Sequence, residues 1–326
     1  NPGLLTAMGL NPTVASFAQL KGLTQKFKTV WSIQTHVRNG LGGTFMNVAQ
    51  GHNPFNKDMK QIFKVISSKT DKELMDYNAD LLELGVINTS PRLREFKELL
   101  SEYNDIMGSA KTSATGAESF LNFMREKVVR KLGTKDYNLE TLDDYMQKVY
   151  MGTDDFFKIS LFEKEKAVLK KAYPDLSEES LAKEAAEIVK NTMPNYDRVT
   201  PGIKSLRNVP VLGAFVSFSE EVVRTGSQTI LQANREILSG NPELMKRGAL
   251  RLSSFALVAG SGTKATEYAS GKAMGWTEEQ IQAVKTFYDR GYGAQSYLFI
   301  KGENGQVDKL NLTMTDPWTI LAHPFA

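Results

Sequence analysis

Apolar residues recur at steps of three and four along most of the chain, which is the spacing of one face of an α-helix. The first stripe of this kind runs from Val14 to Trp31. Further helical stripes begin at Thr70, Ser90, Glu118, Ser177 and Thr277. Thr70–Glu73 and Thr277–Gln280 both have the spacing of a capping box, which satisfies free backbone N–H groups at a helix start. The pattern therefore predicts a mainly α fold, a multi-helix assembly.

Glycine predicts where two of the longer helical patterns are interrupted. Gly152-Thr153 divides the stretch from Leu139 to Tyr173, so we expect two helices there. Asp154 and Asp155 would then lie at a helix start, where carboxylates suit the helix dipole. Gly260-Ser261-Gly262 is expected to end a helix that begins near Glu243. The run Gly40–Gly43 fits either a small-residue helix packed closely on a neighbour or a loop.

Strands are predicted only near the end of the chain. Tyr297–Lys301 and Gln306–Leu312 flank Gly302-Glu303-Asn304-Gly305, a composition typical of a hairpin turn. An isolated hairpin is only marginally stable in water. We therefore expect a small C-terminal β-hairpin that packs on helices or pairs with another chain.

These patterns divide the chain into four parts. Residues 1–60 are expected to form a basic N-terminal helical segment, and residues 61–192 a helical domain. Residues 193–213 contain three prolines, which favour extended or irregular backbone, and we interpret them as a Pro-rich hinge. Residues 214–326 form a helical region that ends in the β-hairpin.

The positive charge of the chain is concentrated at its N-terminal end. The whole chain has 40 basic and 37 acidic residues, a net charge of +3, yet residues 1–60 hold six basic residues and only Asp58 as an acid, which is 6 − 1 = +5. This segment is expected to be a solvated basic face or to bind an acidic partner subunit. Contact with nucleic-acid phosphates or anionic lipid is the alternative. The candidate contact residues are Lys21, Lys26, Lys28 and Arg38.

Composition argues against most common enzyme classes. There is no cysteine, which excludes disulfides, cysteine zinc sites and thiol nucleophiles, and there are only three histidines. Gly260–Lys264 lacks the spacing of a phosphate-binding P-loop. Glu163 and Lys166 have the spacing of an ordinary helix-surface ion pair. We expect no catalytic residues, no metal and no cofactor, although an enzyme that uses only Asp, Glu or Tyr would leave no fixed spacing to find.

A proline-broken apolar element, Arg207–Phe218, comes directly before an amphipathic helix. Polar side chains lie among the apolar positions of that helix: Arg224, Thr225, Gln228, Asn234 and Arg235. Such a mixture suits either a hydrogen-bonded contact between subunits or a core with a polar network. The candidate subunit-contact residues are Phe215, Phe218, Arg224, Arg235 and Trp318.

Several short motifs follow one another in a characteristic order. They are Thr35–Asn39, Asp154–Lys158, Glu163–Ala167, Pro194–Tyr196, Pro210–Phe218 followed by Glu221 and Arg224-Thr225, Ser239–Pro242, and the closing hairpin with Asp316–Trp318. This order resembles that in very large virion-packaged proteins of tailed bacteriophages. These include the internal virion or DNA-ejection proteins of short-tailed phages and the flanking regions of giant encapsidated RNA polymerases. The resemblance spans most of the chain and marks a structural region without catalytic residues.

The resemblance implies a non-enzymatic structural region of an internal virion protein, stored in the capsid near the portal and ejected into the host envelope or cytoplasm. The partners it implies are the portal, other ejection proteins and further copies of the chain, with DNA and the host membrane as further contacts. The alternative is an accessory, nucleic-acid-contacting region of a virion-packaged RNA polymerase or lytic enzyme. Because the chain starts with Asn1, we expect a processed product or part of a longer polypeptide.

Overall fold

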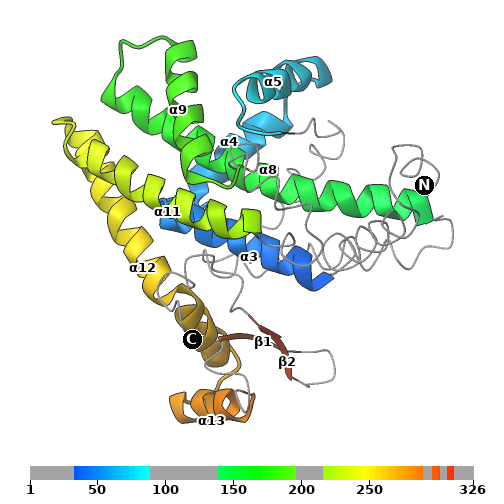
Figure 1. Cartoon of the computed structure of the whole chain (residues 1–326). Coiled ribbons are helices and arrows are strands. Elements are labelled where there is room, and N and C mark those ends of the chain that lie inside the picture. Colours follow the sequence, from blue (N-terminus) through cyan, green and yellow to red (C-terminus); the bar gives the residue numbers. More distant parts are fainter. Residues whose placement is uncertain (1–32, 89–138, 196–215, 289–295, 302–306, 312–326) are drawn as a thin grey trace, which may run out of the picture.

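The computed structural model describes residues 33–88, 139–195, 216–288, 296–301 and 307–311 (Figure 1). Its helices are α3 (Ile33–Ala49), α4 (Lys57–Ser67), α5 (Asp71–Glu83), α8 (Leu139–Ala172), α9 (Glu178–Thr192), α11 (Val216–Ile237), α12 (Pro242–Ala273) and α13 (Glu278–Tyr288). Two strands follow, β1 (Tyr297–Lys301) and β2 (Val307–Asn311). The prediction of a mainly α, multi-helix fold is confirmed.

Helix starts lie where the local sequence predicts them. The backbone N–H of Thr70 donates to Glu73 Oε2 over 2.8 Å, and Thr70 Oγ1 accepts from the Glu73 N–H, so the capping box of α5 is formed. Thr277 and Gln280 make the same reciprocal bonds at the start of α13. Ser177 caps α9, and Asn241 caps α12 directly before its first residue, Pro242.

Both predicted helix breaks are wrong, because α8 runs through Gly152 and α12 runs through Gly260 without interruption. A glycine inside a helix costs only about 1 kcal/mol relative to alanine, and burial of the neighbouring residues outweighs that cost. In α8 the residues after the glycine include Phe156 and Phe157, which are fully buried. The expected helix start at Asp154 and Asp155 is therefore wrong as well.

Two expected charge placements also need correction. Asp154 lies inside α8 and pairs with Lys158 one turn later, over 2.6 Å. Glu163 was predicted to pair with Lys166 on the helix surface, but it accepts a hydrogen bond from the Tyr77 hydroxyl of α5 over 2.8 Å. Lys166 instead pairs with Glu178 at the start of α9, over 3.1 Å. Glu163 and Lys166, whose spacing predicted a pair with each other, therefore bond to residues of other helices instead.

The glycine-rich run Gly40–Gly43 is a helix, as one of its two interpretations predicted, and it packs closely on α8. A Cβ atom at Gly43 would lie 2.1 Å from Cδ2 of Phe157, so close that the ring or the helix would have to shift. One turn further along α3, Asn47 donates its side-chain amide to the Phe157 carbonyl over 3.2 Å. The small residues therefore allow α3 to approach α8.

One apolar core joins every described helix from α3 to α12. Phe63 of α4 stacks on Phe156 of α8 at a ring distance of 4.8 Å, and Val222 of α11 and Phe255 of α12 belong to the same cluster. In Figure 1, α8 crosses the molecule, and α11 and α12 form a hairpin whose two helices meet at the turn and diverge away from it. The core combines parts of residues 1–60, 61–192 and 214–326; the division into four parts stays a prediction.

A second, smaller cluster holds the C-terminal elements on the end of α12. It contains Ile281, Tyr297 and Phe299, with Trp276 at a ring distance of 5.0 Å from Phe299. β1 and β2 pair antiparallel, with Phe299 opposite Lys309. Residues 302–306, on which the predicted hairpin turn depends, lie outside the described residues. So do the predicted helices at Val14–Trp31, after Ser90 and after Glu118, and residues 196–213 of the hinge.

Candidate functional site

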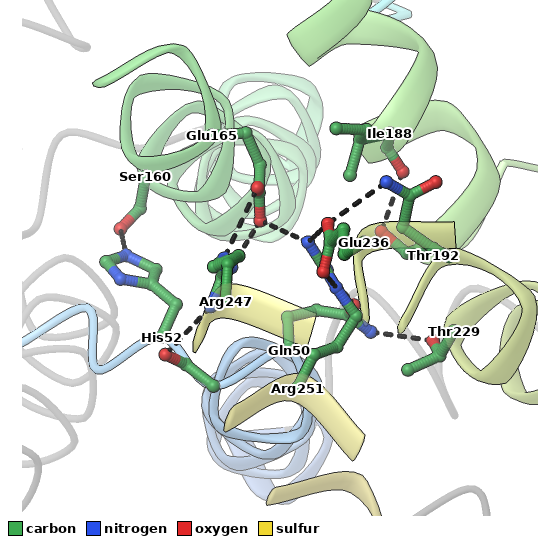
Figure 2. A network of polar contacts seen from close by, with 12 residues as sticks. Gln50, His52, Ser160, Glu165, Ile188, Thr192, Thr229, Glu236, Arg247 and Arg251 are labelled. Carbon is green, nitrogen blue, oxygen red and sulfur yellow. Dashed lines mark hydrogen bonds and ion pairs between the residues drawn. The ribbon is translucent and has the colours of Figure 1, made fainter. Parts of the chain in front are cut away.

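Four charged side chains meet in the interior between α8, α11 and α12 (Figure 2). Arg247 and Arg251 lie one turn apart on the buried side of α12, Glu165 lies on α8 and Glu236 lies on α11. Arg251 Nη2 lies 2.9 Å from Glu165 Oε1 and 2.7 Å from Glu236 Oε1. Arg247 Nη2 pairs with the same Oε1 of Glu165, and Arg247 Nε donates to its Oε2 over 3.4 Å. All four are at most 4% exposed, so two positive and two negative charges balance out of contact with water.

The residues at the end of α3 complete the hydrogen bonding of the two arginines. Arg251 Nη1 donates to Gln50 Oε1 over 2.6 Å, and Gln50 in turn donates to Thr229 Oγ1 of α11 over 2.8 Å. Arg247 Nη1 donates to the Gly51 carbonyl over 3.1 Å. The network therefore joins four helices, and Arg251 lies at its centre.

The electrostatics of the network favour the ionised forms. Burial alone would raise the pKa of the Glu165 carboxyl, but Arg247 and Arg251 outweigh it and lower that pKa to about 2. Burial alone would lower the pKa of Arg251, and the carboxylates of Glu165 and Glu236 raise it instead. Glu165 therefore stays charged at neutral pH.

A histidine adjoins this network. His52 Nε2 lies 2.7 Å from Ser160 Oγ of α8, and both side chains are buried, with exposures of 1% and 0%. Burial, with a smaller effect of the nearby Arg247, lowers the pKa of His52 to about 3, so the imidazole is neutral. Its Nδ1 has no hydrogen-bond partner among the described residues. The fold therefore encloses both side chains of this serine–histidine pair.

A second polar cluster closes the C-terminal end of α9. Arg224 of α11 donates to the carbonyls of Asn191 and Met193, over 2.9 and 3.0 Å, which are among the acceptors that a helix end leaves free. Glu221 holds that guanidinium at 2.6 Å and accepts the backbone N–H of Asn195 over 2.7 Å. Arg224 and Thr225, two of the polar residues predicted on this helix, therefore bond within the chain, whereas Asn234 and Arg235 are exposed.

The structure brings few of the predicted contact residues together. Arg224 bonds to Glu221 and to the carbonyls at the end of α9, and Arg235 is exposed on the same helix. Arg38 lies in α3 and Phe218 in α11, but their side chains lie outside the description. The remaining candidates, Lys21, Lys26, Lys28, Phe215 and Trp318, lie outside the described residues. The roles assigned to these residues in subunit or nucleic-acid contact stay predictions.

Sequence reasoning missed the central network. Its members are Gln50, Glu165, Glu236, Arg247 and Arg251. One signal was available: Arg247 and Arg251 lie at i, i+4 among apolar residues, on the side of the helix that should be buried. Their acidic partners lie 82 and 15 residues away, and no local spacing connects them.

No protein family, no curated protein and no solved structure matches this chain. Among the described residues, no group of three or more His, Cys, Asp or Glu side chains is placed to hold a metal ion. Within the same part of the chain, none of the helices has the length and hydropathy that a bilayer-crossing segment requires.

Proposed function

We propose that this chain is a non-enzymatic, helical structural region of a bacteriophage internal virion protein. In this proposal it is packaged in the capsid near the portal and ejected on infection. It assembles in several copies with the portal and other ejection proteins. The proposal rests on the order of motifs in the sequence, and what the motif residues do in the fold supports it.

The observation that carries the proposal is that residues of these motifs connect helices. Glu165 belongs to the central network, and Glu221 and Arg224 close the end of α9. Asn241 caps α12 and also donates its side-chain amide to the Ala172 carbonyl at the end of α8, over 2.9 Å. Each of these polar residues makes contacts within the fold, which is what a structural region requires.

The central network also suits a part that must adopt one arrangement of its helices. Burying four charges is costly, and the cost is recovered only when every partner is in place. A packing of α8, α11 and α12 that separated these side chains would leave buried charges unpaired. The network therefore favours a single register of these helices over others with similar apolar contacts.

The test is the composition of purified virions of the virus that encodes the chain. Mass spectrometry of nuclease-treated particles is expected to yield peptides from α8, α9, α11 and α12 in several copies per particle. Cryo-electron microscopy is expected to show helical density inside the capsid that fits the α8–α9 and α11–α12 hairpins. Particles that lack the chain, while infected cells contain it, would contradict the proposal.

A second candidate function is contact with nucleic acid through the N-terminal end, as an accessory region of a virion-packaged polymerase or lytic enzyme. The observation that favours it is charge: no acidic residue precedes Asp58. Phosphate contacts predict DNA binding that weakens steeply with salt and weakens further when Lys21, Lys26 and Lys28 are replaced together by glutamine. Binding that neither change affects would exclude this candidate.

A further inference from the structure

The exposed sides of α11 and α12 carry many large apolar side chains. Of the fourteen large hydrophobic residues exposed in the described part of the chain, nine lie on these two helices or at their junction. They are Val223, Ile230, Leu231, Leu238, Met245, Leu250, Leu252, Leu257 and Tyr268. Leu257 and Leu238 are 65% and 83% exposed. Exposed apolar residues gathered in this way mark a surface for a partner.

The charges exposed beside these residues are almost all positive. The sequence of α12 contains only two acids, Glu243 in its first turn and Glu267, which is buried. Three lysines are exposed along the same helix, Lys246, Lys264 and Lys272. On α11 the carboxylates of Glu221 and Glu236 are buried in the networks described above, and Glu220 is half-buried near its start.

The fold explains why this face lacks negative charge. Glu165 and Glu236 neutralise Arg247 and Arg251 in the interior, so the acids of this region face inward. Among the residues that the structure describes, the lysines of α12 make no ion pair, and Lys272 Nζ lies 5.4 Å from the centre of the Tyr268 ring on the same helix. By contrast, α5 exposes mainly acids, among them Asp76, Asp80 and Glu83. The two ends of the molecule therefore differ in surface charge.

Anionic lipid is the partner that fits both properties of this face. Apolar side chains of a helix that lies in the plane of a bilayer enter the boundary of the acyl chains, while lysines extend their ammonium groups to the phosphates. Two copies packed through this face would place lysines against lysines, which disfavours self-association. A flat bilayer can also meet both helices at once, because α11 and α12 are joined by a short turn and diverge from it (Figure 1).

We propose that the outer face of the α11–α12 hairpin binds in the plane of an anionic lipid bilayer. The apolar residues of both helices enter the membrane interface, and Lys246, Lys264 and Lys272 contact lipid phosphates. This inference rests on the exposure and charge of the described residues. It does not depend on the proposed place of the chain in a virion.

The test is flotation of the full chain with vesicles of phosphatidylcholine, with and without phosphatidylglycerol, at low and high salt. Binding is expected only with the anionic lipid, and it should weaken at high salt because the phosphate contacts are screened. Leu257→Glu is expected to abolish flotation. Lys264→Gln is expected to reduce the partition coefficient about fivefold, the effect of one cation near an anionic surface.

Helix α4 offers matched controls on another face. Val65 is 57% exposed there, close to the exposure of Leu257, and Lys64 is its exposed neighbour. Val65→Glu and Lys64→Gln should leave flotation unchanged, and circular dichroism melts should show all four variants folded. No flotation of the parent chain, or equal losses in the α4 variants, would overturn the proposal. So would light scattering that shows a dimer lost in Leu257→Glu without any vesicle binding, because the face would then be a protein interface.

Discussion

Replacement of Arg251 by methionine is expected to be among the most destabilising single changes in this protein. Arg251 is fully buried and makes charge-assisted bonds to Glu236 over 2.7 and 3.0 Å and to Glu165 over 2.9 Å, besides its bond to Gln50. Methionine fills much of the volume but leaves Glu236 buried without its cation. Removing one partner of a buried ion pair costs about 3–5 kcal/mol, a large part of the 5–15 kcal/mol that holds a typical domain folded.

The measurement is urea unfolding at neutral pH, followed by the helical signal in circular dichroism. Arg251→Met is expected to lower the free energy of unfolding by about 3–5 kcal/mol, with a midpoint shifted to lower urea at a similar slope. Arg235→Met is the matched control, because Arg235 is exposed on α11 and the same substitution should change stability by no more than about 0.5 kcal/mol.

A loss below about 1 kcal/mol in Arg251→Met would refute this reasoning, because it would mean that the buried carboxylates do not depend on the guanidinium. A further variant tests whether the loss of stability comes from an unpaired buried charge or from the absence of the charged side chains themselves. Replacing Glu165, Glu236, Arg247 and Arg251 together by apolar residues of similar volume is expected to be nearly neutral or stabilising, as it is for other buried ion-pair clusters.

Three further predictions concern single positions. Gly43→Ala should destabilise the fold by about 1–3 kcal/mol because its Cβ meets Phe157, whereas Gly260→Ala, with no atom within 4 Å, should stabilise α12 by about 0.5–1 kcal/mol; thermal melts of the pair should move in opposite directions. Thr70→Ala should cost about 1 kcal/mol in urea unfolding through loss of the α5 cap, and an unchanged midpoint would contradict it. His52 has a pKa of about 3 in the fold against 6.5 when unfolded, so the neutral form is stabilised by folding. The contribution of His52 to the free energy of unfolding is therefore complete above pH 6.5 and falls by up to about 1.4 kcal/mol per pH unit below it. In urea unfolding measured from pH 7 to 5, the parent chain should lose stability with this slope, and His52→Gln should lack that part of the pH dependence.

Local chemistry explains the parts of the fold that the sequence predicts well. The capping residues Thr70, Ser177 and Thr277 lie at helix starts, because a cap involves bonds within a single turn. The break between α11 and α12 at Gly240-Asn241-Pro242 also depends on local residues, since Gly240 adopts a φ of 73° and Asn241 caps the next helix. Such features need no information from the rest of the chain.

Glycines and charges inside helices required the tertiary structure. Gly152 and Gly260 look like helix breaks, but each costs too little to end a helix whose neighbouring residues are buried. Glu163 has the spacing of a surface partner for Lys166 and in fact accepts a bond from Tyr77, which is 86 residues away. Local spacing shows which pairs are within reach, and packing decides which of them form.

The sequence by itself determined the helical class of this protein, its helix caps and the concentration of positive charge before Asp58. Only the tertiary structure decided that Arg247 and Arg251 face inward and meet Glu165 and Glu236, and that lysines and leucines of α12 remain outside. The physical reason is the distance along the chain over which each interaction acts. Helix propensity and capping act within one turn, whereas the pairing of a buried charge depends on partners that folding brings from distant helices.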